Sequence, residues 1–120
     1  MSPSTLKPLP PTLREKKRYL VFEAISKNHI LPLSKAAKAI AFAYASLHGQ
    51  RGAASAGLIY LAKRSDENKQ RGILRVDRRN VTDLKAALTL VKDIDGQETI
   101  IRSIGVSGML KKAEDRFVAS

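Results

Sequence analysis

The spacing of apolar residues predicts a strand and then a helix in the first half of the chain. Residues 19–22 (YLVF) form a compact run of aromatic and β-branched side chains, which is typical of a buried strand. Ser34, as the N-cap, and Gly49, as a residue that tolerates a left-handed conformation, mark the two ends of a helix over 35–48.

Two more strands and a second helix are predicted in the middle of the chain. The strands, 56–63 and 72–78, are joined by a polar segment too short for a crossover helix, so we expect them to pair antiparallel. Asn80 and Asp83 resemble a capping box at the start of the second helix. Apolar residues then recur at helical spacing, at Val81, Leu84, Leu88 and Val91.

The last part of the chain predicts a fourth strand and a short final helix. Asp95 and Gly96 stop the second helix, and residues 98–106, rich in isoleucine, form the strand. Ser107 is placed to cap the final helix, whose apolar stripe is Leu110, Ala113 and Phe117.

This order of elements predicts an α+β fold. Strand, helix, strand, strand, helix and strand make a ferredoxin-like or RRM-like split βαβ arrangement. We expect a four-stranded antiparallel sheet with two helices on one face, plus the short C-terminal helix. Residues 1–13 hold four of the five prolines and are predicted to be an extended arm, and residues 14–120 form a single domain.

The composition excludes several classes of functional site and favours one class of partner. The chain has 120 residues, 22 Lys and Arg against 11 Asp and Glu, a net charge of +11 and no cysteine. Disulfides, thiolate metal sites and cysteine nucleophiles are therefore excluded, and a cytoplasmic location is expected. Apolar runs are too short for a membrane span. A positive field this strong attracts polyanions, and nucleic acid is the first candidate.

Arginines cluster around the third strand. Alternation sends Leu74 and Val76 to one face of the sheet, and Ile73, Arg75 and Asp77 to the other. Arg71, Arg78 and Arg79 flank the strand, and guanidinium groups beside an open sheet face suit RNA phosphates. The alternative is a solvated edge with Arg75 paired to a carboxylate.

Base stacking of the RRM kind is poorly supported by the sequence. The third strand lacks the aromatic residues on which RRM domains stack bases, and Tyr19 or Phe22 of the first strand would have to replace them. Recognition of the RNA backbone or shape is therefore favoured.

The first helix predicts a protein interface. Residues 39–47 carry no charge on any face, and Phe42 points away from the side that packs on the sheet. Phe42, with Ala39 and Ala45, is a candidate contact for a partner protein or for a second copy of the chain. A lone exposed phenylalanine among alanines is the alternative.

Catalytic signals are weak. His29 and His48 have no sequence neighbours that suggest a metal site or a nucleophile pair. Asp93 and Asp95 faintly resemble a calcium loop, but a turn explains them. Asp77 and Asp83 are the candidate magnesium ligands of a small nuclease, although Asp83 already has a role at a helix start.

At these residues the chain resembles the archaeal ribonuclease P protein component 2 family, which also has eukaryotic members. The resemblance is carried by residues 10–20 (PPTLREKKRYL), 71–79 (RGILRVDRR) and 100–117 (IIRSIGVSGMLKKAEDRF). Met109 departs from it, since a hydroxyl residue is expected there. The resemblance implies a subunit of ribonuclease P, the ribonucleoprotein that removes the 5′ leader from precursor tRNA.

The resemblance also implies which tasks belong to the RNA and which to the protein subunits. The RNA carries the active site and requires Mg²⁺, and the protein binds no cofactor of its own. The chain contacts precursor tRNA indirectly and supports the RNA together with ribonuclease P protein component 3 and the other protein subunits. The residues carried over as RNA contacts are Arg14, Lys17, Arg18, Arg75, Arg78, Arg79, Arg102 and Lys111.

Three functions therefore remain open at the level of the sequence. They are a ribonuclease P subunit, an independent basic RNA-binding protein of the ribosomal type, and a metal-dependent nuclease. The charge-free first helix favours the subunit, because an independent binder needs no apolar docking surface.

Overall fold

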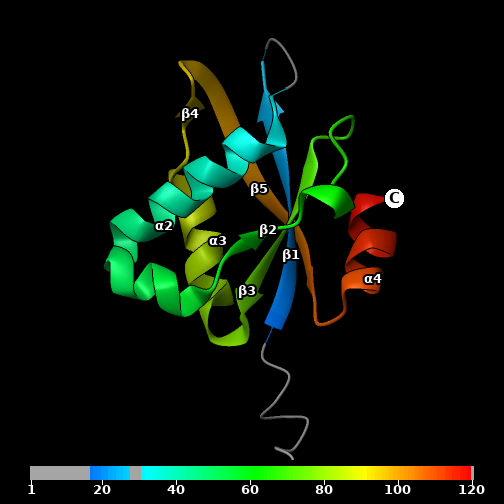
Figure 1. Cartoon of the computed structure of the whole chain (residues 1–120). Helices are drawn as coiled ribbons and strands as arrows, with labels where there is room; N and C mark the ends of the chain where they lie inside the picture. The colour runs from blue at the N-terminus through cyan, green and yellow to red at the C-terminus, as the bar shows by residue number, and fades with distance from the viewer. Residues whose placement is uncertain (1–16, 28–30, 120) are drawn as a thin grey trace, which may run out of the picture.

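The computed structural model describes residues 17–27 and 31–119, and the first strand is the centre of its sheet. β1 (Lys17–Ser26) pairs antiparallel with β3 (Arg71–Asp77) on one side and with β5 (Gln97–Ser107) on the other. Two short strands, β2 (Ile59–Tyr60) and β4 (Asp93–Ile94), form the edges, so the order is β2-β3-β1-β5-β4 (Figure 1). The predicted arm, 1–13, lies outside the described residues.

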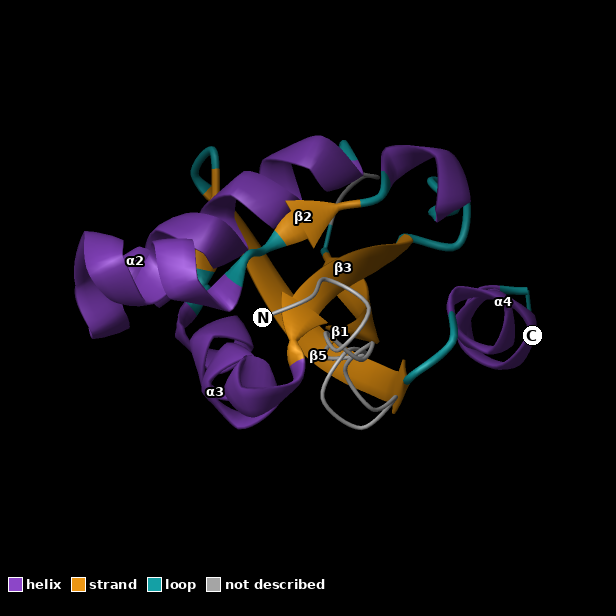
Figure 2. Cartoon of the chain, turned by 60° about the horizontal axis from the view of Figure 1, so that its bottom comes forward, coloured by secondary structure: helices purple, strands orange, loops and turns teal. Residues whose placement is uncertain are grey.

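Helices cover both faces of this sheet. α2 (Leu33–Ala56) and α3 (Val81–Leu90) lie on one side (Figure 2). α4 (Leu110–Ala113), continued by the π-helical turn η4 (Glu114–Val118), lies on the other.

The alternation along β1 divides the core between the two faces. Leu20 and Phe22 are fully buried in the larger cluster, under α2 and α3. Val21 is fully buried in a smaller cluster with Ile73 of β3 and Ala113 of α4. The predicted alternation of β3 is confirmed, because Leu74 and Val76 belong to the larger cluster and Ile73 to the smaller one.

The sheet has five strands rather than the predicted four. The additional strand, β4, forms a hairpin with β5 through Asp95 and Gly96, whose φ angles are 53° and 76°. Positive φ at both central residues is the geometry of a two-residue hairpin turn, for which Asp-Gly is a preferred sequence. The prediction that Asp95 and Gly96 stop the second helix is therefore wrong, because α3 ends at Leu90 and these two residues instead join β4 to β5.

The prediction of a strand over 56–63 is wrong for most of its length, because only two of these residues form a strand. Gly49 (φ 75°, ψ 173°) kinks α2 instead of ending it, and the alanine-rich segment beyond the kink stays helical up to Ala56. Gly57 ends the helix in the left-handed conformation, and its N–H donates to Ala54 O at 3.2 Å. The remaining strand contains Ile59 and Tyr60 alone.

The start of α2 is capped by a distant loop and not by Ser34, so that prediction is corrected. The helix begins at Leu33, whose N–H donates to Glu67 Oε1 at 3.1 Å. Gln70 fixes Leu31, two residues before the helix, because its side chain accepts from Leu31 N at 2.9 Å and donates to Leu31 O at 2.8 Å. Residues more than 30 positions away thus supply the groups that a local cap would supply.

The caps predicted at Asn80 and Ser107 also differ from what the structure shows. Asn80 occupies the N-cap position of α3 but makes no capping hydrogen bond with its side chain, which bonds to Tyr44 instead. Ser107 Oγ accepts from the N–H of Met109, the residue before α4, at 3.1 Å.

The sheet face predicted to be open is partly covered by α4 and η4. Phe117 lies directly on Gly105, where a Cβ atom would come within 2.4 Å of the ring, so this close approach requires glycine. Arg71 donates to Phe117 O at 2.9 Å, and Lys69 donates to Ala119 O at 2.6 Å. These bonds satisfy carbonyls at the end of the short helix and hold it on the sheet.

Met109 gives a prediction about stability. It is the N-cap of α4, with extended backbone (φ −126°, ψ 129°) and no side-chain acceptor for the free N–H groups of the first turn. Met109→Ser should supply that acceptor and raise the free energy of unfolding by about 1 kcal/mol, measured by urea denaturation. Met109→Ala is the control, because it removes the methionine without adding an acceptor. Equal stability of the two variants would contradict the prediction.

Candidate nucleic-acid interface

Strand register brings six of the predicted cationic contacts to one end of the sheet. β1 begins where β3 ends, with Lys17 opposite Asp77 and Arg18 opposite Val76. β3 runs directly into the 3-10 turn η3 (Arg78–Asn80), and β5 ends opposite Tyr19 before the chain enters α4. We call this region the basic end, and it comprises Lys17, Arg18, Arg75, Arg78, Arg79 and Lys111.

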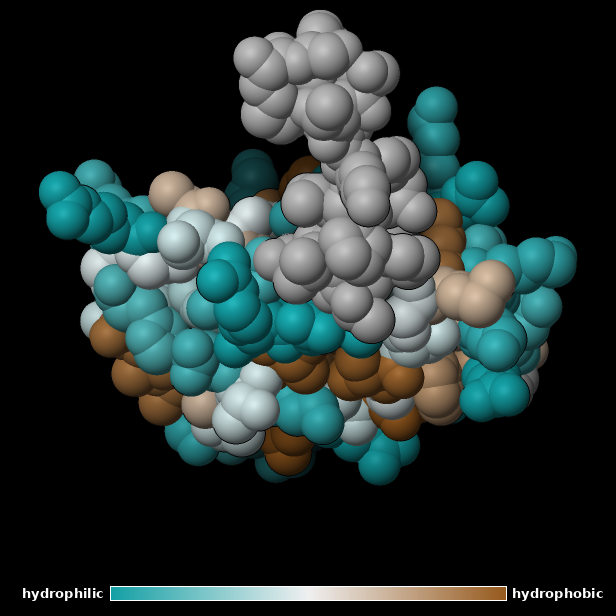
Figure 3. Space-filling model, turned by 90° about the horizontal axis from the view of Figure 1, so that it is seen from below, coloured by the Kyte–Doolittle hydropathy of each residue, from teal (hydrophilic) through white to brown (hydrophobic). Residues whose placement is uncertain are grey.

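Hydrophilic side chains gather on this end of the molecule. Figure 3 views this end from below. The coloured surface there is hydrophilic (teal) over large areas, with apolar patches (brown) between them. With 22 basic residues against 11 acidic ones in the whole chain, such a surface favours a polyanion.

The carboxylate within the basic end serves to position an arginine. Asp77 is buried, and its Oδ1 accepts from Arg79 N at 2.9 Å and from Arg79 Nε at 3.3 Å. These two hydrogen bonds, the backbone one first, hold the pKa of Asp77 below its ordinary value of 3.8 even though burial opposes them. Asp77 therefore stays ionised at neutral pH and fixes the 3-10 turn that carries Arg79.

Arg75 occupies an unusual position for an arginine. It lies between Tyr19 of β1 and Ile59 of β2 in the sheet register, and it is half-buried. Its Nε atom is buried and has no hydrogen-bond partner among the residues that the structure describes. An unpaired buried donor costs about 1–3 kcal/mol, so this arginine is not there to stabilise the sheet.

Arg102, another predicted contact, is not part of the basic end. It lies opposite Glu23 on β5 and donates from Nε to Glu23 Oε1 at 2.8 Å. Glu23 Oε2 also lies 3.4 Å from Nε of Arg71, and the Arg71 guanidinium donates a hydrogen bond to Phe117 O. Arg102 and Arg71 thus belong to a network next to the end of η4. The remaining candidate, Arg14, lies outside the described residues.

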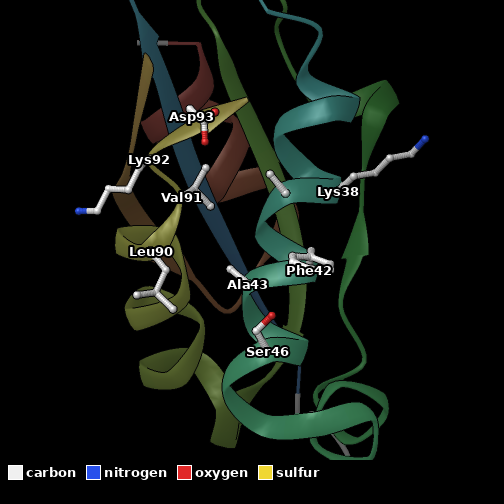
Figure 4. A pocket seen from close by; sticks show the side chains of 9 residues that line it. Lys38, Phe42, Ala43, Ser46, Leu90, Val91, Lys92 and Asp93 are labelled. Atoms are coloured by element: carbon white, nitrogen blue, oxygen red, sulfur yellow. The ribbon is translucent and has the colours of Figure 1, made fainter. Parts of the chain in front are cut away.

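An apolar groove, which shares no residue with the basic end, lies between α2 and the end of α3. It has a volume of about 640 Å³ and is lined by Ala39 and Phe42, as the sequence indicated, and by Leu90 and Val91 (Figure 4). Phe42 is 76% exposed and Leu90 is 48% exposed. Ala45, the third candidate, is half-buried and does not line the groove. Leu90 was missed because it falls outside the apolar stripe of its helix.

Of the histidines and acidic residues singled out by the sequence, His48 and Asp83 lie near each other. His48 Nε2 lies 4.0 Å from Asp83 Oδ1, and its ring packs against Tyr44 with 4.6 Å between centroids. Within 17–27 and 31–119, no three histidine or acidic side chains come together in a way that would hold a metal ion. None of the described helices is both long enough and apolar enough to cross a membrane. His29 lies outside the described residues.

Comparison with known proteins places the chain in a family. A model of the Rpp14/Pop5 family matches residues 18–118, which include the groove and all of the basic end except Lys17. The chain belongs to the Rpp14/Pop5 family. This finding confirms the resemblance that the sequence motifs carried.

Curated relatives of this family member are similar over nearly their whole length. Ribonuclease P protein component 2 of Thermococcus gammatolerans is 45% identical, covering 92% of this chain and 90% of that protein. The proteins of the same name from Pyrococcus furiosus and Methanocaldococcus jannaschii are 43% and 36% identical, each over 94% of this chain and over 92% and 81% of their own lengths.

A solved structure shares the fold. The chain superposes on part of the cryo-EM structure of yeast ribonuclease MRP with a TM-score of 0.61, covering 78% of this chain and 75% of that one. Because the identity is 13%, this likeness concerns the fold alone.

Proposed function

We propose that the chain is a ribonuclease P protein subunit that supports the catalytic RNA and supplies no catalytic group of its own. Membership of the Rpp14/Pop5 family and relatives named ribonuclease P protein component 2, up to 45% identical, support the subunit assignment. The basic end is the observation that carries the role, because it concentrates six cations and the carboxylate beside them, Asp77, is bonded to Arg79.

Phosphate neutralisation is the proposed mechanism. In removal of the 5′ leader of precursor tRNA, Mg²⁺ held by the RNA would supply the activation of the attacking water. Arginines and lysines of the basic end lower the repulsion between RNA segments, so the segments and the metal reach the geometry of reaction. Arg79 is held in place by Asp77 before RNA arrives, which reduces the entropy that binding must remove.

The apolar groove is the proposed docking surface for ribonuclease P protein component 3. An exposed phenylalanine above a groove lined by Leu90 and Val91 suits an apolar side chain of a partner. Lys38, Lys92 and Asp93 border the groove and provide the polar rim typical of such interfaces. The groove and the basic end lie on different parts of the fold, so both contacts are compatible.

Cleavage of precursor tRNA tests the function. Ribonuclease P RNA at modest Mg²⁺ should cleave the 5′ leader faster when this chain and component 3 are added together, whereas the proteins without RNA should be inactive. Stimulation would support the accessory role. Binding to unrelated RNA without stimulation would favour an independent RNA-binding protein, and cleavage by the chain alone in Mg²⁺ would favour a nuclease.

The basic end is tested by the salt dependence of RNA binding. Replacing Arg75, Arg78 and Arg79 by alanine should flatten the slope of log affinity against log salt by up to about 2, at roughly 0.7 per lost phosphate contact on single strands. The control replaces Lys27, Lys38 and Lys92, which removes the same charge away from the basic end. Equal slopes for the two triple variants would refute the assignment.

The groove is tested by Phe42→Ala. Since Phe42 is exposed, its loss should weaken binding of component 3 by about tenfold or more while leaving the unfolding free energy nearly unchanged. Calorimetric titration and urea denaturation measure the two effects. Ile100→Ala is the matched control, because Ile100 is also exposed (62%) but lies on β5, outside the groove. A destabilised variant that still binds component 3 normally would place Phe42 in the core instead.

A further inference from the structure

Four residues form a row across the sheet at the basic end. Ile59 lies opposite Arg75, Arg75 opposite Tyr19, and Tyr19 opposite Ser107, on β2, β3, β1 and β5. Residues directly opposite each other in antiparallel strands project from the same face, with Cβ atoms about 4.5–5.5 Å apart. The row therefore presents a tyrosine ring flanked by a guanidinium on one side and a hydroxyl on the other.

The row lies on the face that α4 covers, but beyond the part that is fully covered. Tyr19 packs against the cluster of Val21 and Ile73, which is buried under α4, while Tyr19 itself is only half-buried. Arg75 is also half-buried, and Ile59 is 44% exposed. The helix thus leaves one end of this face accessible.

Positive charge borders the ring on one side. Arg75 is its direct neighbour on β3, whereas Arg18 lies opposite Val76 and therefore projects to the other face of the sheet. Asp77, two residues after Arg75 on β3, is committed to Arg79 by two hydrogen bonds. An aromatic surface beside a guanidinium group matches a nucleobase whose phosphate lies on that side.

The geometry limits the site to a single base. Phe22, the other aromatic residue of the strand that could have offered a ring, is fully buried under α2 and α3 and is therefore excluded. The position next to Tyr19 on the same face, Val21, lies under α4. A base within a duplex presents no free face for stacking, so the base must be unpaired.

We propose that Tyr19, flanked by Arg75, stacks on one unpaired nucleotide of an RNA whose backbone the basic end holds. The proposal rests on the RNA-binding role of the basic end and adds to it a preference for a bulged or looped nucleotide over a continuous duplex. This changes the expectation from sequence, which favoured backbone or shape recognition without stacking.

Binding of two matched RNA hairpins tests the site. One hairpin carries a single bulged 2-aminopurine, and the other has the same stem fully paired. The wild-type chain should bind the bulged hairpin more tightly and quench its fluorescence. Tyr19→Leu should weaken that binding roughly 5- to 100-fold, the range expected for loss of one stacked base, and leave the paired hairpin unaffected.

Two variants control for the aromatic ring and for its position. Tyr19→Phe keeps the ring and should retain the preference for the bulged hairpin. Tyr60→Leu removes another half-buried tyrosine, one that packs in the larger cluster on the opposite face, and should not change it. The salt slope of Tyr19→Leu should equal that of the wild type, because the ring neutralises no phosphate.

The outcomes separate this proposal from the proposed function. Unchanged preference in Tyr19→Leu, with the normal salt dependence, would overturn the stacking site and leave the phosphate contacts intact. Absence of salt-dependent RNA binding by the wild type would overturn both. If Tyr19→Leu does not fold, a photocrosslink from 4-thiouridine at the bulge of the wild-type complex decides the question. Attachment at Tyr19 supports the site, and attachment elsewhere refutes it.

Discussion

Three successive residues of β1 are fully buried, and the rest of the structure depends on that constraint. Leu20 and Phe22 project to one face and Val21 to the other, so water must be excluded from both faces of the central strand. α2 and α3 cover the first face. The nine residues of α4 and η4 cover the second, and they are too few to do so by packing alone. Contacts from Arg64, Lys69 and Arg71 to this segment supplement its small apolar surface.

Covering both faces decides where charge can be placed. A guanidinium in the middle of either face would be costly to bury, so the cations are found where strands end and the backbone turns away from the core. Lys17 and Arg18 begin β1, and Arg78 and Arg79 follow β3, which brings them together because the strands are antiparallel. Arg75 is the exception, because it lies inside a strand. Its Nε is buried and has no partner among the described residues, as expected for a cation placed at an energetically costly position.

The elements with a strong hydrophobic period were predictable from the sequence. β3 and β5 agree with the predicted spans to within one residue at each end, and α3 begins where its apolar spacing predicts, although it ends at Leu90, before the predicted stop at Asp95. The segment after Gly49 was not predictable, because alanines fit a helix without facing a core and carry little periodic signal. Ser34 was a reasonable local cap, but Glu67 and Gln70 supply that role through tertiary contacts that no local pattern reveals.

The candidate site was also predictable only in part. Residue types indicated a cationic surface, and antiparallel pairing was enough to gather most of it at one end. Pairing of Arg102 with Glu23 depends on a register shift in the β1–β5 ladder between Val21 and Phe22, which sequence does not specify. Leu90 likewise joins the groove only because α3 ends beside α2.

One buried side chain links the two proposed surfaces. Tyr44 follows groove residue Ala43 on α2, and its hydroxyl bonds to Asn80, which directly follows Arg78 and Arg79. Because Tyr44 is 1% exposed, moving α2 relative to η3 would expose a large apolar ring and break a buried hydrogen bond. The groove and the basic end are therefore held in a fixed relative orientation. Such rigidity suits a protein that positions one partner against another, since orientation established before binding lowers the entropy lost in assembly.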